Sequence, residues 1–317
     1  MRVLILGGTR FVGLGLAEAL LAASHQVTTA SRRPEKAPHG AEQIGGLRDE
    51  LLAQLRGRSF DVVVDFICWD GDGPANVLAS LNFSRYVLVS TVYMQLLSRQ
   101  QGPGEPIHDP DWESLPNDRY REYLGQKLAA ETSLLQQRVH GMPGTLIRLP
   151  VMWGDRDHSH RAGFYLSRLM DQQPIILVNG GENVAQIAWG TDVARAMATW
   201  ISTDMPLSKP VWEALPDKGR SVREIVEGMA TAVGASPELH SVSAARLTDE
   251  IPEYLEKEPL WRERFLGQSN SNLFDAVGVA PTDQLVWFSR LASAACGPEH
   301  RAMRSRELAC LDSSSRQ

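Results

Sequence analysis

The chain has 317 residues, of which 43% are hydrophobic and 22% charged, a mixture typical of a globular protein with a large core. Its formal net charge of −6 disfavours general binding to nucleic acids and other polyanions. Cys68, Cys296 and Cys310 are too widely spaced for a metal or disulfide framework, and no apolar stretch has the length of a membrane span. The apolar start of the chain is too short for a secretory signal, so we expect a cytoplasmic protein.

Short apolar runs alternate with helical patterns through the first half of the chain. We expect strands at 2–6, 26–30, 61–67, 86–90 and 145–149, and helices at 11–23, 192–201 and 221–233. This alternation predicts an α/β fold built on a doubly wound parallel sheet.

The pattern weakens after Pro150, where polar residues become more frequent. We expect a dinucleotide-binding domain over 1–154, to which 188–202 returns. A smaller C-terminal substrate-binding lobe would comprise 155–187 and 203–296, and 297–317 has the composition of a frayed tail.

A glycine-rich turn, GGTRFVG, follows the first strand. Gly7 permits a tight turn, and Gly13 lets the helix pack closely on the strand. Because the free N–H groups at a helix start attract phosphate, we favour a dinucleotide site over an ordinary turn. Arg10 stands where such patterns usually have another glycine, and its guanidinium can bind phosphate in a bidentate way.

The end of the second strand bears on which dinucleotide is bound. NAD sites usually have an acidic residue there, which accepts hydrogen bonds from the ribose 2′-OH. Here Ser31, Arg32 and Arg33 follow Thr29 and Ala30, with no acid. Since arginines suit a 2′-phosphate, we favour an NADP(H) site. The alternatives are an NAD(H) site and a solvated basic loop that binds no phosphate.

Tyr123 and Lys127 lie in a helical stretch, four residues apart and therefore on one helix face. An ammonium lowers the pKa of a nearby phenol from about 10, which makes a tyrosine a plausible general acid or base. Ser90 and Thr91 end a predicted strand, at the edge where α/β sheets bind ligands. Either hydroxyl could hold a substrate oxygen, or simply make strand-end hydrogen bonds.

Together these residues resemble the extended short-chain dehydrogenases/reductases, the NAD(P)-dependent epimerase/dehydratase group. A glycine turn with an arginine in the middle resembles that of a branch of this group called atypical. The resemblance covers most of the chain to about residue 235. Its segments, in the family's order, are GGTRFVG at 7–13, VVVDFI at 62–67, VLVST at 87–91, YLGQK at 123–127, IRLPVMWG at 147–154 and TDVARA at 191–196.

The resemblance implies hydride transfer, with Tyr123 donating or removing the hydroxyl proton and Lys127 binding the nicotinamide ribose. Thr91, with Ser90 as the less favoured candidate, would hydrogen-bond the reacting oxygen. The loop after Leu149 would pass near the nicotinamide. The expected cofactor contacts besides Lys127 are Gly7, Gly8, Thr9, Arg10, Phe11, Val12, Gly13, Ser31, Arg32, Arg33, Phe66, Ile67, Cys68, Pro150 and Val151.

Two departures from the family narrow the reaction. Its nucleotide-sugar dehydratases have an acidic pair after the strand-end threonine, where this chain has Val92 and Tyr93. Its epimerases often have a diphosphate-binding arginine seven residues before the Asp192 motif, where this chain has Ala185, although Arg161, Arg168 and Arg264 could substitute. We therefore predict an NADPH-dependent ketoreductase acting on a small or medium carbonyl substrate, for example a sugar or natural-product intermediate.

Two alternatives stay open. One is an NAD-dependent nucleotide-sugar epimerase, and the other is a non-catalytic NAD(P)- or RNA-binding regulatory protein, against which the retained Tyr–Lys pair and the negative charge count. We expect a small-molecule substrate, no nucleic-acid or membrane partner, and a possible homodimer through two helices.

Two loops complete the sequence predictions. The segment 94–117 is long for a compact domain, and we predict that it covers the active site. Carboxylates and imidazoles alternate over 155–160, which we interpret as a solvated or substrate-contacting loop and not as a metal site.

Overall fold

The computed structural model describes residues 1–98, 104–115, 118–203, 209–216, 218–264, 266–291 and 299–314. The chain divides into two compact units. Unit 1 contains Met1–Val151, Gly190–Pro216 and Leu266–Pro281, and unit 2 contains Met152–Trp189, Asp217–Phe265 and Thr282–Gln317.

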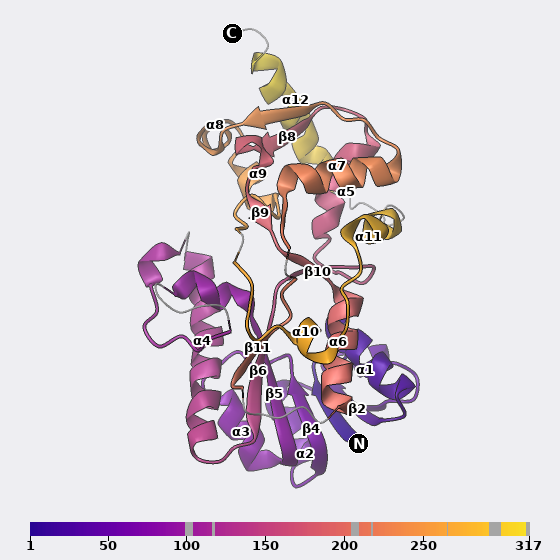
Figure 1. The fold of residues 1–317 in the computed structure, drawn as a ribbon, viewed down its shortest axis with the longest axis vertical. Helices are drawn as coiled ribbons and strands as arrows, with labels where there is room; N and C mark the ends of the chain where they lie inside the picture. Colours follow the sequence, from indigo (N-terminus) through magenta and orange to yellow (C-terminus); the bar gives the residue numbers. More distant parts are fainter. Residues whose placement is uncertain are drawn as a thin grey trace. The chain divides into compact units, whose positions relative to one another are not determined.

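Unit 1 is built on a seven-stranded sheet in which every pairing is parallel (Figure 1). The strands are β1 (Arg2–Leu6), β2 (Gln26–Ser31), β3 (Glu42–Gly45), β4 (Ser59–Asp65), β5 (Asn82–Thr91), β6 (Gly144–Leu149) and β11 (Val211–Glu213). Their order is β11-β6-β5-β4-β1-β2-β3, so the winding reverses at β1. The predicted doubly wound α/β fold is confirmed.

The helices of unit 1 flank this sheet (Figure 1). They are α1 (Phe11–Ala22), α2 (Arg48–Leu55), α3 (Gly73–Ser80), α4 (Asp118–Val139), α6 (Gly190–Ser202) and α10 (Leu273–Val277), with short 3-10 turns η1 (Pro34–Lys36), η2 (Val92–Leu97) and η3 (Trp112–Ser114). Helices α1 and α6 pack closely. A Cβ added at Gly15 of α1 would lie only 3.1 Å from the Cβ of Ala194 on α6.

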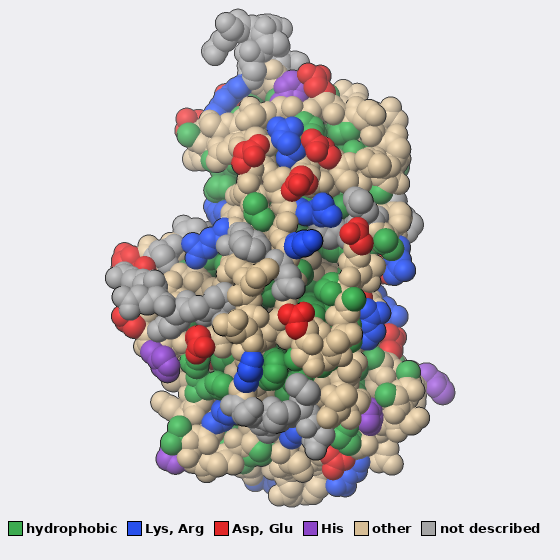
Figure 2. All heavy atoms as spheres, in the orientation of Figure 1, with side chains coloured by type: hydrophobic (Ala, Val, Ile, Leu, Met, Phe, Trp, Pro, Cys, Tyr) green, Lys and Arg blue, Asp and Glu red, His purple; other side chains and the backbone are tan. Residues whose placement is uncertain are grey.

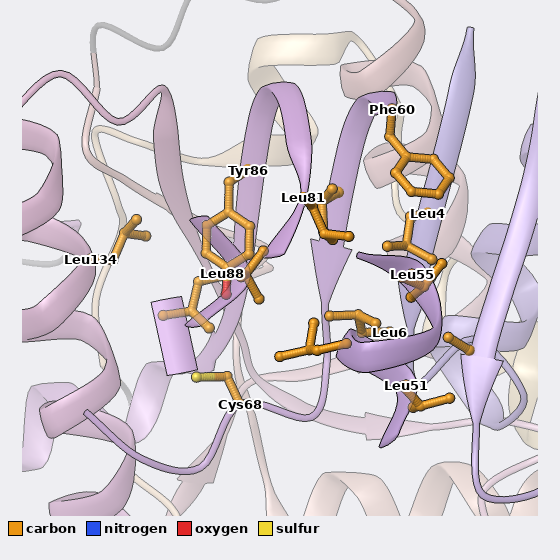
Figure 3. Close-up of a cluster of buried hydrophobic side chains, with 14 of the residues drawn as sticks. Leu4, Leu6, Leu51, Leu55, Phe60, Cys68, Leu81, Tyr86, Leu88 and Leu134 are labelled. Atoms are coloured by element: carbon orange, nitrogen blue, oxygen red, sulfur yellow. The ribbon is translucent and has the colours of Figure 1, made fainter. Parts of the chain in front are cut away.

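A buried aliphatic cluster joins the sheet to α2, α3 and α4 (Figure 3). Leu4, Leu6 and Leu88 contribute from the sheet, and all three side chains are at most 1% exposed. Leu51 and Leu55 come from α2, and Leu134 comes from α4. The nearly continuous apolar runs of the strands reflect burial of this sheet on both faces.

Unit 2 contains short strand pairs and an aromatic core. Its elements are β7 (Val151–Trp153), which begins at the last residue of unit 1, α5 (Arg161–Met170), β8 (Ile175–Val178), η4 (Asn179–Gly181), β9 (Val184–Ala185), β10 (Ile187–Trp189), β12 (Arg220–Ser221), α7 (Val222–Val233), β13 (Leu239–Val242), α8 (Ala244–Glu250), α9 (Pro252–Lys257), α11 (Gln284–Leu291) and α12 (Glu299–Ser314). The strands pair as β10-β7, β12-β9 and β13-β8. The rings of Trp153 and Trp287 meet edge to face, with centroids 6.3 Å apart.

Two segments differ from the sequence prediction. Residues 211–213, assigned to the smaller lobe, form β11 and extend the central sheet beside β6, and 266–281 also belong to unit 1. Within the predicted frayed tail, 299–314 form α12, which is held by a buried ion pair between Glu307 and Arg168 of α5. Sequence periodicity misses both because each depends on a partner far away in the chain.

Parts of three other predictions lie outside the described residues. These are Cys296, residues 297–298 and 315–317 of the predicted tail, and residues 99–103 and 116–117 of the predicted lid. The part of the lid that the structure describes includes η2 and η3. Among the described helices, none combines the length and the apolarity needed to cross a bilayer.

Candidate active site

The glycine turn between β1 and α1 is closely packed at its two functional glycines. Gly7 has a φ of +92°, and a Cβ there would lie 2.9 Å from the Ile67 side chain and 3.0 Å from the Phe66 side chain. A Cβ at Gly13 would lie 2.7 Å from the Gly7 carbonyl oxygen. The turn therefore tolerates no side chain at either position, as expected where a helix start must approach a strand end and a ligand.

The residues between these glycines face different surroundings. Arg10 occupies the N-cap position of α1 and is exposed, whereas Thr9 and Val12 are buried. Phe11 begins the helix with a φ of 39° and packs on the start of α6, where a Cβ at Gly190 would lie 2.5 Å from its ring. The guanidinium of Arg10 can thus reach a ligand at the helix start without filling the turn.

The end of β2 lies beside this turn. The hydroxyl of Thr9 donates to Ser31 Oγ at 2.8 Å, and the Arg33 N–H donates to the same atom at 3.1 Å. Ser31 is 7% exposed, while Arg32 and Arg33 are exposed. Two hydrogen bonds therefore hold the Ser31 hydroxyl in place and leave its own proton to donate.

Leu47 is a residue near this edge that sequence reasoning missed. It follows Gly46, whose N–H donates to the Ser31 carbonyl at 3.2 Å, and its side chain is 59% exposed. An exposed leucine two residues after the end of β3, at the edge where α/β sheets bind ligands, is the signal that could have found it.

Lys127 of α4 lies at the ends of β4 and β5. Its Nζ donates to the carbonyl oxygens of Cys68 at 3.1 Å and Val89 at 3.3 Å, and the side chain is 5% exposed. Burial lowers the pKa of Lys127. Tyr123, one helical turn earlier, is half-buried in a cluster formed by α4, η2 and η3.

Thr91 and Ser90 end β5, and neighbouring residues of a strand point to opposite faces. The Thr91 hydroxyl accepts a hydrogen bond from the Tyr93 N–H at 3.2 Å, which caps η2. Ser90 is 6% exposed, and its Oγ has no hydrogen-bond partner among the described residues.

The loop after β4 carries Phe66, Ile67 and Cys68. Phe66 and Ile67 lie against Gly7, so they are beside the glycine turn as expected. Cys68 is fully buried, and burial raises the pKa of its thiol to about 12, so it is no nucleophile. Asp65, the last residue of β4, accepts two hydrogen bonds from Arg48 of α2 and one from the Tyr86 hydroxyl.

The residues after β6 form a strand, although a loop was expected. Pro150 is buried and separates β6 from β7, in which Val151 is the first residue.

Comparison of the sequence with known protein families identifies the family of the chain. Residues 3–209 match the NAD dependent epimerase/dehydratase family. The chain belongs to this family. The resemblance predicted from the motifs is therefore confirmed.

Two characterised relatives of the chain have names that point to different functions. The chain is 28% identical over 215 residues to 2′-dehydrokanamycin reductase of Streptomyces kanamyceticus, a match covering 64% of this chain and 59% of that protein. It is also 28% identical over 217 residues to the chloroplast stem-loop binding protein of 41 kDa b of Arabidopsis thaliana, covering 62% and 53%. The matches thus span less than two thirds of either relative.

Solved structures of the epimerase/dehydratase fold match nearly the whole chain. The UDP-glucose 4-epimerase of Thermus thermophilus in complex with NAD has a TM-score of 0.65 at 19% identity, covering 93% of this chain and 100% of that one. At this identity the likeness establishes the fold alone.

The three arginines that could replace the family's diphosphate-binding arginine differ in their exposure to solvent. Ala185 itself lies buried on β9. Arg168 is 1% exposed and paired with Glu307, so it cannot serve, whereas Arg161 and Arg264 are exposed. In the 155–160 loop, Asp157 accepts hydrogen bonds from Ser159, and among the described residues no group of three or more metal-ligating side chains occurs.

Proposed function

We propose that the chain is an NADPH-dependent ketoreductase in which Tyr123 and Lys127 work as a pair. The observation that carries this proposal is the position of Lys127, whose ammonium is buried at the ends of β4 and β5, one turn from Tyr123. A buried ammonium favours the phenolate over the phenol in its neighbourhood, so Tyr123 can release its proton to a developing alkoxide.

The glycine turn fits a dinucleotide. A Cβ at Gly7 would collide with the Ile67 and Phe66 side chains, and one at Gly13 with the Gly7 carbonyl oxygen. Both positions therefore require glycine, as in turns that a pyrophosphate approaches closely. Gly7, Gly8, Thr9 and Gly13 would hold the pyrophosphate against the α1 N-terminus, with Arg10 at its edge. When bound, NADPH supplies the hydride.

The preference for NADPH rests on the β2 end. Ser31 has a fixed hydroxyl, and Arg32 and Arg33 are exposed beside it with no carboxylate at the strand end. Two guanidiniums and a hydroxyl suit a 2′-phosphate better than a neutral ribose 2′-OH. The exposed Leu47 would offer an apolar surface to the adenine.

The proposed catalytic roles follow from the residues around the ends of β4 and β5. Thr91 would donate a hydrogen bond to the substrate oxygen, and Tyr123 would give it a proton. Lys127 would bind the nicotinamide ribose. Because Val92 and Tyr93 replace the family's acidic pair, the chain lacks the groups for elimination.

The burial of Arg168, one of the arginines that could have bound a diphosphate, favours reduction over epimerisation. Arg168 is occupied by Glu307, and Ala185 offers no charge, so a nucleotide diphosphate has fewer partners than the family's epimerases provide. The name of the Streptomyces relative, a reductase of a ketone on an aminoglycoside, agrees with this choice.

The first experiment compares the two cofactors. The purified protein is checked for retained nucleotide and titrated with NADPH and NADH by nicotinamide fluorescence, and NADPH oxidation is then followed with 2′-dehydrokanamycin and simpler cyclic ketones. We expect reversible binding that favours NADPH, ketone-dependent oxidation, and loss of turnover but retained binding in Tyr123→Phe. Retained NAD with interconversion of UDP-glucose and UDP-galactose would replace this proposal with the epimerase.

A second candidate function is RNA binding, which the name of the Arabidopsis relative favours. The net charge of −6 opposes it, and on the face drawn in Figure 2 Lys and Arg side chains are interspersed with Asp and Glu. Salt-dependent binding of a stem-loop RNA without binding of either nicotinamide cofactor would support it. Homodimer formation through two helices, one of them α4, is a further proposal that light scattering tests.

A further inference from the structure

Trp69 lies in the loop after β4 and touches both members of the proposed catalytic pair. The Lys127 Nζ lies 4.1 Å from the centroid of the Trp69 ring. The centroids of Trp69 and Tyr123 are 5.9 Å apart, with their planes inclined by 54°. Trp69 is nevertheless 44% exposed, which is unusual for so large an apolar side chain.

The surroundings of Lys127 explain why this ring matters. The ammonium has two carbonyl oxygens as acceptors, and in the part of the chain that the structure describes no carboxylate lies within ion-pair distance of it. A buried charge without an ion pair needs other stabilisation. The negative face of an indole ring supplies it, and tryptophan is the best of the aromatic side chains in this respect.

The titratable groups around Lys127 are engaged elsewhere. From β4 and its loop, Asp65 is paired with Arg48 of α2, and the Cys68 thiol holds its proton because burial raises its pKa. On α4 itself, Glu131 is paired with Arg148. Besides its two carbonyl acceptors, the ammonium faces the Trp69 ring, which has no ion pair competing for it among the described residues.

We propose that Trp69 is a positioning residue that keeps the Lys127 ammonium charged and in place beside Tyr123. This inference rests on the proposed function for its catalytic meaning, but its physical content concerns the free protein. Removal of the π face destabilises the charged form of Lys127, so its proton is lost at lower pH. Since the ring also packs on Tyr123, its removal loosens the phenol as well.

The test measures the titration of Lys127 directly. The chain has five lysines, Lys36, Lys127, Lys209, Lys218 and Lys257, so 15N-labelled lysine gives few Nζ resonances, and Lys127→Met assigns the one of interest. The variants are Trp69→Leu, which removes the π face, and Trp69→Phe, which keeps one. Trp261→Leu, a tryptophan of unit 2, is the matched control.

We expect Trp69→Leu to lower the pKa of Lys127 by about 0.5 unit or more, Trp69→Phe to lower it by less, and the control to leave it unchanged. With an active substrate, the alkaline limb of the pH–kcat profile should move in the same direction and be restored in part by Phe. An unchanged Lys127 titration in Trp69→Leu overturns the inference, and so does an equal shift in Leu and Phe. A shifted titration in a protein that reduces no ketone leaves this inference standing and counts against the proposed function alone.

Discussion

The guanidinium of Arg148 on β6 donates two hydrogen bonds, of 3.1 and 2.6 Å, to the carboxylate of Glu131 on α4, and both side chains are at most 1% exposed. Glu131 lies one helical turn beyond Lys127. Glu213 of β11 approaches the same guanidinium at 3.7 Å and accepts a hydrogen bond from Gln95 of η2. These contacts fasten the helix that carries Tyr123 and Lys127 to three other elements.

Removing Arg148 should therefore destabilise the fold strongly. In Arg148→Met two carboxylates stay buried without their cation, and we expect the free energy of unfolding to fall by about 3–5 kcal/mol in urea denaturation. The exposed pair of Arg223 and Glu227 on α7, 3.8 Å apart, is the control, and Glu227→Gln should change stability little. Similar losses in both variants would show that burial of the Arg148 pair carries no special weight.

The two hydroxyls at the end of β5 should behave differently. We expect Thr91→Ala to lower kcat by about 10²-fold or more, because it removes a donor to the developing alkoxide, while Thr91→Ser keeps most of the activity. Ser90→Ala is the matched control, and its kcat should stay near the wild-type value. The reverse ranking in steady-state kinetics would transfer the role to Ser90, whose Oγ is buried without a described partner.

Cofactor choice should depend on Arg32 and Arg33 but not on Arg10. The double variant Arg32→Ala/Arg33→Ala should weaken NADPH binding by about 10- to 100-fold and leave NADH binding unchanged, because only NADPH has the 2′-phosphate. Arg10→Ala should weaken both cofactors to a similar extent, since both contain the pyrophosphate. Fluorescence titration gives the dissociation constants, and equal losses for both cofactors in the double variant would contradict the assignment.

Glu258 in unit 2 should make stability depend on pH. Its carboxyl accepts hydrogen bonds from the Tyr165 hydroxyl and from the N–H groups of Leu260 and Trp261, and burial raises its pKa to about 8 from the ordinary value of 4.5. Because the folded protein keeps a proton that the unfolded chain releases, this stabilisation is complete below pH 4.5 and is lost as the pH rises to about 8.

We therefore expect the free energy of unfolding of the wild type to fall between about pH 5 and pH 8 by on the order of a few kcal/mol more than that of Glu258→Gln. Glu256→Gln, at an exposed position of α9, the helix that ends just before Glu258, should follow the wild type. Parallel curves for the wild type and Glu258→Gln in urea denaturation at each pH would refute the assigned titration.

The sequence by itself determined the elements that depend on local pattern. The apolar run at 2–6, the glycines at 7 and 13 and the alternation after them predicted the parallel sheet and its ligand-binding edge, since periodicity and glycine conformation are local properties. The capping box of Ser221 and the left-handed Gly234 likewise mark the limits of α7. Family membership followed from the same short motifs.

Only the tertiary structure decided which distant residues meet. Residues 211–213 are too few to show a period, and they became a strand because β6 offered an open edge. Glu307 holds α12 through Arg168, 139 positions earlier, and this contact also removed that arginine from the candidates for binding substrate. Trp69 is one more aromatic residue in the sequence. Its contacts with Tyr123 and Lys127 depend on how the loop after β4 folds against α4, which no local pattern encodes.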